Sequence, residues 1–239
     1  MGFERMQQEH LIYLMPTPII DSDHKRVRDF AMETIDGSND PVERAVKLYL
    51  AARDSILYDP YSPFYLPEHF RASYVLKRGG SFCVPKASLL CALGRASGIP
   101  SRVGLADVRN HLTTKQLIDF IGSNLFVCHG FVEFYLEGKW VKATPAFNSS
   151  LCIKHKVLPL EFDGREDSLF QAYNTDNQKF MEYIKFHGIY ADVPVADIVA
   201  AWKKAYGEER VQTWIRRFEE EGDRSLSDFE KEDVLTEGG

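Results

Sequence analysis

One cysteine of this 239-residue chain occupies a position where a thiol can become a nucleophile. Cys83 follows the flexible segment 79–82. A largely apolar stretch with helical spacing begins at this cysteine, has Pro85 in its first turn and continues to Gly98. Unpaired N–H groups and the helix dipole stabilise an anion there, so we expect a lowered thiol pKa. The same N–H groups could hold the oxyanion of a tetrahedral intermediate. Cys83 is therefore the candidate nucleophile, and an inert buried cysteine is the alternative.

A histidine in the clearest predicted strand, 127–136, is the candidate base. Side-chain alternation puts His129 and Glu133 on one face of this strand, and Cys128 and Gly130 on the other. The alternative for a lone strand histidine is a hydrogen-bonded structural role, and we expect Glu133 to form an ion pair. Gly130 indicates that another segment comes close to the strand. A catalytic imidazole also needs a residue that fixes its tautomer, which we expect on the strand that follows.

The remaining patterns predict helices and short strands around these two elements. Helices are expected over 22–35, 40–56, 67–76, 113–121, 180–186, 195–206 and 208–218. Strands are expected over 101–109, 139–143 and 157–162, and the short turn at 137–138 joins 127–136 and 139–143 in a hairpin. Residues 1–218 are predicted to form a single domain, and the acidic segment 219–239 a disordered tail.

The composition excludes several classes of function. A net charge of -6 and a pI near 5.7 provide no basic field for nucleic acid. We expect a cytoplasmic protein, because no signal peptide and no apolar stretch of about 18 residues is present. Cysteines without a CxxC pair favour free thiols, no metal and no other cofactor. A metalloprotein that uses Cys83, Cys128, His129 and Cys152 is the weaker alternative, because these positions lack a closely spaced ligand pair.

Two segments together resemble the transglutaminase-like superfamily. Residues 79–103 contain a cysteine that opens a helix, followed by an Arg-x-x-Gly-Ile-Pro-x-Arg pattern that leads into a strand. Residues 129–141 resemble the histidine strand of that family and its Gly-x-Trp turn. The resemblance implies an α+β, papain-like fold in which N-terminal helices and a buried nucleophile helix pack on an antiparallel sheet. It also implies a Cys-His-Asp triad that forms a thioester on Cys83.

The third member of the implied triad departs from the family pattern. The family places an aspartate just after the tryptophan strand, and here Thr144 occupies that position. A threonine hydroxyl can accept a hydrogen bond from imidazole but brings no charge to stabilise imidazolium. Asn148 could orient the ring instead, and Asp163 is a more distant candidate.

These observations leave two main functions open. The first is a cysteine-dependent amide hydrolase or acyltransferase, peptidase-like or transglutaminase-like, that acts on a peptide or small amide. Gly80, Phe82 and Tyr74, which precede the nucleophile, are then predicted to lie at the substrate site. The second is a catalytically weak or inactive binding protein of the same fold, which the replacement of the acid by Thr144 favours.

Overall fold

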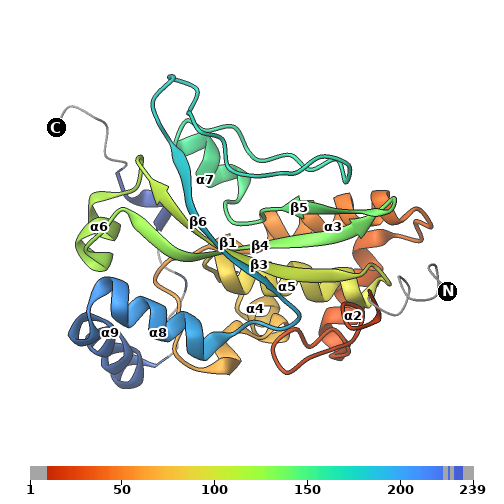
Figure 1. Ribbon diagram of the computed structural model, residues 1–239, viewed down its shortest axis with the longest axis horizontal. Coiled ribbons are helices and arrows are strands. Elements are labelled where there is room, and N and C mark those ends of the chain that lie inside the picture. The colour runs from red at the N-terminus through yellow and green to blue at the C-terminus, as the bar shows by residue number, and fades with distance from the viewer. Residues whose placement is uncertain (1–9, 223–225, 227–228, 234–239) are drawn as a thin grey trace.

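An antiparallel sheet of four strands, in the order β5-β4-β3-β6, is the centre of the fold. The computed structural model describes residues 10–222, 226 and 229–233 (Figure 1). The strands are β3 (Ser101–Asn110), β4 (Leu125–Leu136), β5 (Lys139–Ala143) and β6 (Met181–Tyr190). A short parallel pair, β1 (Leu57–Tyr58) and β2 (Gly80–Ser81), stands apart from this sheet.

Helices cover the sheet and extend from one end of it. Helix α5 (Cys83–Ala96) packs on β4 and β3, and its other sides contact α2 (Lys25–Ile35), α3 (Pro41–Ser55) and α4 (Ala72–Arg78). The other helical elements are η1 (Pro67–Phe70), α6 (Lys115–Ile121), α7 (Ser149–Lys154), α8 (Val195–Tyr206), α9 (Glu208–Glu221) and η2 (Phe229–Lys231). Helix α8 contacts β4, and α9 packs on α8 (Figure 1). The predicted α+β arrangement, with the buried helix that Cys83 opens packed on an antiparallel sheet, is confirmed.

The sequence of α5 explains why this helix is the core of the molecule. Every residue from Val84 to Arg95 is buried, as the apolar pattern predicts. The two long cations in it are satisfied by carbonyl groups of other segments. Lys86 donates to the Arg53 and Ile56 carbonyls, and Arg95 donates to three carbonyls, including that of Ser101. These bonds offset the cost of burying charge and tie α5 to α3 and β3.

One glycine sets how closely α5 approaches the sheet. A Cβ atom at Gly130 of β4 would lie 2.7 Å from the Val84 Cα, closer than carbon atoms pack. Only glycine lets the first turn of α5 rest directly on the strand. The expectation that another segment comes close to Gly130 is confirmed, and this contact brings Cys83 to the strand of His129.

Two predictions of secondary structure are wrong for physical reasons. Residues 181–190 form β6 rather than a helix, and its pairing with β3 contains two register shifts. These bulges place apolar residues at irregular intervals, which mimics helical spacing. Residues 157–162 form no strand. Val157 and Phe162 are buried, but the Leu160 carbonyl accepts hydrogen bonds from the side chains of Tyr49 and Arg53 rather than from a neighbouring strand.

Part of the predicted disordered tail has regular structure among the described residues. Residues 219–221 complete α9, and 229–231 form η2. Phe229 is buried against the rings of Tyr58 and Tyr61. Residues 223–225, 227–228 and 234–239 of that prediction lie outside the described residues.

Candidate active site

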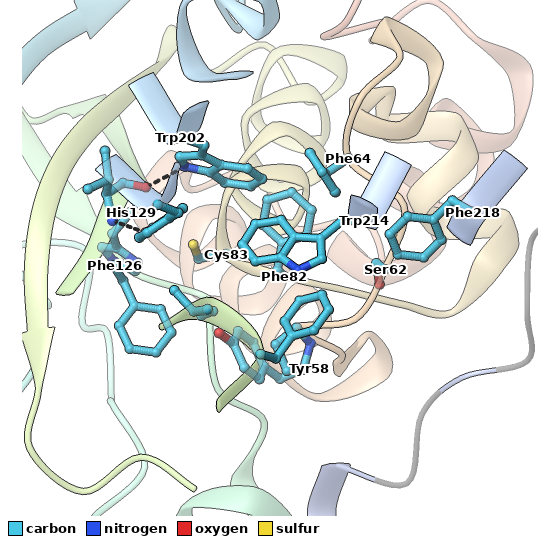
Figure 2. A pocket seen from close by; sticks show the side chains of 15 residues that line it. Tyr58, Ser62, Phe64, Phe82, Cys83, Phe126, His129, Trp202, Trp214 and Phe218 are labelled. Carbon is cyan, nitrogen blue, oxygen red and sulfur yellow. Dashed lines mark hydrogen bonds between the residues drawn. The ribbon is translucent and has the colours of Figure 1, made fainter. Parts of the chain in front are cut away.

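A pocket with aromatic walls opens onto the start of α5. Cys83 and His129 both line it, and Figure 2 draws the Cys83 sulfur among the aromatic side chains. The cavity measures about 60 Å³, and apolar surface dominates its walls. Its other lining residues are Tyr58, Pro60, Ser62, Phe64, Phe82, Phe120, Ile121, Phe126, Val127, Trp202, Tyr206, Trp214 and Phe218. A site of this kind suits an apolar group placed next to the sulfur.

Cys83 is the first residue of α5, as the sequence predicts, and it is only partly buried. The N-cap of this helix is Phe82, which offers no side-chain acceptor. Three backbone N–H groups can therefore donate to the sulfur and lower the pKa of the thiol. They belong to Gly130 on β4 and to Val84 and Cys83. Burial outweighs these donors and raises the pKa of the Cys83 thiol to about 11. The expectation of a lowered pKa is wrong because the apolar walls disfavour a thiolate more than the N–H groups stabilise it.

His129 is buried in β4, and its ring lies 4.9 Å from the ring of Phe170. Burial lowers the pKa of this imidazole to about 3, so it is neutral at physiological pH. Its Nε2 atom has no hydrogen-bond partner among the described residues. Cys83 and His129 are thus a neutral thiol and a neutral imidazole in one pocket, rather than a preformed ion pair.

Thr144 follows β5 directly and is buried, and its hydroxyl lies near the Tyr183 hydroxyl but makes no hydrogen bond of normal geometry in the described part of the chain. Since neither Thr144 Oγ1 nor His129 Nε2 has a partner there, no hydrogen bond joins them. Thr144 holds the sequence position where a third triad member is expected, but it does not line the pocket and does not bond the imidazole Nε2. Two unpaired polar atoms buried in this way are costly and need an explanation.

The two other candidates for the third residue have partners elsewhere in the structure. Asn148 accepts a hydrogen bond from the Tyr58 backbone and donates to Ser150 and Glu230, so its amide holds together the segments around η2. Asp163 is exposed and accepts from the N–H groups of residues 165 and 166 in its own loop. Both side chains have the local capping or bridging roles common for Asn and Asp outside helices.

Of the three residues predicted at the substrate site, one lines the pocket and two do not. Phe82 lines the pocket. Gly80 does not, because it pairs with Leu57 in the β1–β2 ladder and packs against the Leu226 side chain. Tyr74 of α4 does not line the pocket either, and its ring lies 5.9 Å from that of His69. A substrate-binding role for Gly80 and Tyr74 thus finds no support in this pocket and stays a prediction.

The aromatic residues contributed by the C-terminal helices are missing from the sequence-based interpretation. Trp202 and Tyr206 of α8 and Trp214 and Phe218 of α9 all line the pocket. Each pair has a spacing of four residues, which puts both side chains on one face of its helix. That spacing is the signal that could have identified them. Trp202 is held in place by a hydrogen bond from its indole nitrogen to the Val127 carbonyl (Figure 2).

Among the described residues, one group could offer three ligand atoms to a metal ion, namely Asp107, Cys128 and His187. The set Cys83, Cys128, His129 and Cys152 is not such a group. Cys128 does not line the pocket, as its predicted orientation requires. Glu133 forms the expected ion pair, with Arg102 at 2.6 Å. None of the described helices has both the length and the apolar character needed to cross a membrane.

Comparison with known proteins places these observations in context. Residues 28–145 match the family model described as the transglutaminase-like superfamily. No curated protein matches the chain. One solved structure, of a "Putative Cysteine Protease" from Cytophaga hutchinsonii, is similar at 17% identity and a TM-score of 0.43, over 56% of this chain and 40% of that one. Another, of a "putative protease" from Parabacteroides distasonis, is similar at 21% identity and a TM-score of 0.36, over 49% of this chain and 22% of that one. The chain thus spans less than half the length of either protein.

Proposed function

The chain belongs to the transglutaminase-like superfamily through residues 28–145, and from that premise we propose that it is a cysteine-dependent amide hydrolase or acyltransferase with Cys83 as nucleophile. The observation that carries the proposal is the position of the sulfur. Cys83 opens α5 beside the N–H groups of Val84 and Gly130, in a pocket that His129 also lines. These are the parts that acyl transfer needs: a nucleophile, a proton acceptor and donors for an oxyanion.

The neutral state of both groups determines how the reaction begins. Because the thiol and the imidazole are each uncharged, the proton moves from Cys83 to His129 as the sulfur attacks the amide carbonyl, and not beforehand. A carbon–sulfur bond forms, and the carbonyl oxygen becomes an oxyanion near the N–H groups of the first turn. The carbon–nitrogen bond then breaks, and His129 returns the proton to the leaving amine. Water or a second amine attacks the thioester and regenerates the thiol.

The walls of the pocket favour an apolar, aromatic acyl group. The rings of Phe64 and Phe82 both pack against Trp202, and Trp202 and Trp214 come from the C-terminal helices. Aromatic rings pack well edge to face, and such pairs add roughly 0.5–1.5 kcal/mol beyond area burial. We therefore propose a peptide or small amide with an aromatic side chain as substrate. All four cysteines are free thiols, which suits the reducing cytoplasm.

The 4-nitrophenyl ester of hydrocinnamic acid tests this function. The native protein is expected to release a burst of one nitrophenol per chain, followed by slower turnover. Cys83→Ala abolishes the burst, whereas Cys152→Ala, which changes another buried cysteine, retains it. The acetate ester, which leaves the aromatic pocket empty, reacts more slowly. Equal rates for Cys83→Ala and the native protein would refute the proposal.

A second candidate function, a non-catalytic binding protein, rests on the His129 Nε2 and the Thr144 hydroxyl, both unpaired within the described residues. No described residue bonds the imidazole at Nε2 to fix its tautomer, and loss of the acid lowers activity by about 10⁴-fold in a serine protease. Thr144→Asp discriminates between the two functions. For an enzyme, the new carboxylate increases the burst rate at least tenfold, and Thr144→Asn is the neutral control. For a binding protein, neither the native chain nor Thr144→Asp forms an acyl-enzyme.

A further inference from the structure

A second group of reactive side chains lies on three adjacent strands, outside the pocket. Asp107 of β3, Cys128 of β4 and His187 of β6 each offer one ligand atom, and these atoms all lie within 4.8 Å of one another. None of the three lines the pocket. We propose that these three residues bind one zinc ion.

The present distances are close to those of a zinc site. With Zn–S near 2.3 Å and Zn–N or Zn–O near 2.0–2.2 Å, tetrahedral ligand atoms lie about 3.3–3.6 Å apart. Asp107 Oδ1 and His187 Nε2 are 2.6 Å apart and share a hydrogen bond. They separate by under about 1 Å when an ion replaces the shared proton, while the sulfur moves inward by about 1 Å.

The backbone at this point departs from regular sheet geometry. Both strand pairings of β3 shift register beside Asp107, and Val127 and Cys128 together stand opposite it. Cys128 has a φ of 61°, a left-handed conformation that costs energy for a residue other than glycine. The Cys128 N–H donates to Asp107 Oδ1 at 3.0 Å. Bulges of this kind redirect side chains next to functional sites, and here they turn the thiol towards the carboxylate and the imidazole.

The donor atoms select the metal. One sulfur, one imidazole nitrogen and one carboxylate oxygen suit zinc rather than calcium or magnesium, which prefer oxygen alone. On binding, Cys128 loses its thiol proton to solvent, and the imidazole proton of His187 moves from Nε2 to Nδ1. Thiolate and carboxylate then neutralise the two positive charges of the ion. The side chains of Asp107 and His187 are 13% and 21% exposed, so water can reach a fourth position.

Nearby charges neither exclude nor complete the site. Burial is the largest cause that raises the pKa of the Cys128 thiol, Asp107 and Cys83 raise it further, and of the more distant charges Lys185 of β6 lowers it and Asp197 of α8 raises it. Because Cys128 directly precedes His129, a bound ion would also fix the part of β4 that carries the candidate base.

Cobalt and zinc titrations of the chelator-treated protein test the proposal. One Co²⁺ per chain is expected to give thiolate-to-cobalt charge-transfer absorption, and one Zn²⁺ displaces it and raises the melting temperature. Cys128→Ser is expected to lose the charge-transfer band. His187→Gln weakens zinc binding by more than about 100-fold, because loss of even an outer-shell partner costs 10–100-fold. Cys83→Ala is the matched control and keeps both signals, which excludes chelation by Cys83 and His129.

Three results would overturn the proposal: no stoichiometric uptake by the native chain, uptake lost in Cys83→Ala, or full affinity retained in both Cys128→Ser and His187→Gln. Should Cys128→Ser fail to fold, as judged by circular dichroism, His187→Gln decides alone. That residue lies partly exposed on an edge strand, where substitution is well tolerated.

Discussion

The protein has two cysteine–histidine groups, Cys83 with His129 and Cys128 with His187. They come together at Cys128 and His129, which are neighbours on β4, and they differ in the hydrogen-bond partner of the imidazole. His129 shares a pocket with Cys83, but its Nε2 has no partner among the described residues. His187, near Cys128, is bound to the Asp107 carboxylate at 2.6 Å. Within the described residues no acid bonds the Nε2 of His129, and the acid–imidazole pair lies in the other group. A histidine next to a cysteine is therefore insufficient to identify a catalytic site, because the third residue decides which chemistry each pair can perform.

The two groups are also held in place differently. Packing positions the first, since Gly130 lets the start of α5 touch β4. Hydrogen bonds and a bulged backbone position the second. Apolar packing leaves Cys83 and His129 uncharged, whereas the second group contains a carboxylate. We expect acyl transfer only at the first and metal binding only at the second.

The largest expected effect is the difference in acyl transfer between a variant that lacks Cys83 and one that lacks Cys128. Cys83→Ala is expected to lower acyl transfer by at least about 10³-fold, as loss of a nucleophile does in other enzymes. Cys128→Ser should change it by less than about tenfold, because Cys128 does not line the pocket. Single-turnover ester hydrolysis measures both. Comparable losses in the two variants would mean that the groups are not functionally separate.

The next effect concerns stability in acid. The pKa of His129 is about 3 in the folded chain, against 6.5 for an unperturbed histidine. Between about pH 6.5 and 3 the unfolded state therefore binds a proton that the folded state does not bind. The free energy of unfolding falls as the pH drops through this range. At about pH 4.5 this loss is about 2–3 kcal/mol for a fully buried imidazole.

Urea unfolding at pH 7 and about pH 4.5 measures this loss, with His129→Gln expected to lose less stability than the native chain. His155, whose pKa burial lowers to about 4, adds a similar contribution. His155→Gln is therefore the matched variant, and the double variant should be the least sensitive to acid. An unchanged acid dependence in His129→Gln would mean that its imidazole is not kept neutral by burial.

A smaller effect on stability and acylation is expected when the contact between α5 and β4 is disturbed. Gly130→Ala places a Cβ 2.7 Å from a backbone atom of α5 and should destabilise the fold by about 1–3 kcal/mol. It should also slow acylation of Cys83. Gly104→Ala is the comparison, since its Cβ would lie 2.2 Å from the buried ring of Phe131, away from α5; it should also lower stability but leave acylation of Cys83 unchanged. Thermal unfolding and acylation rates together test whether Gly130 positions the nucleophile.

The smallest effect should come from removing the unpaired hydroxyl. Thr144→Val keeps the shape of the side chain and deletes a buried oxygen that has no partner in the described residues. We expect stability to be unchanged or increased by about 1 kcal/mol, because a buried unsatisfied hydroxyl is costly. A clear loss of stability in denaturant unfolding would mean that Thr144 does have a partner and could orient His129.

The sequence predicts the nucleophile helix and the histidine strand well because both depend on local signals. A cysteine before Pro85 and a buried run ending at Gly98 define α5, and alternation around Gly130 defines β4. The third residue was not predictable in this way. Asn148 reaches Glu230, which lies 82 residues away, and no local pattern indicates that contact.

The pKa of Cys83 and the shape of the pocket depend on distant segments as well. Trp202 and Trp214 reach the pocket from helices more than 100 residues beyond the cysteine in the chain. They supply the apolar surface that offsets the helix-start donors, so a lowered pKa inferred from the first turn alone was wrong. Strand β6 was mistaken for a helix because its bulges at Asp107 hide the alternation of a strand.

Mass spectrometry after brief exposure to the hydrocinnamate ester is the most direct test of the claim that Cys83 is the nucleophile. Acid quenching followed by peptide mapping should find one hydrocinnamoyl group per chain on Cys83, and the group should disappear on further incubation in water. A hydrocinnamoyl group divided evenly among the cysteines, or none on Cys83 while ester is consumed, would contradict the account.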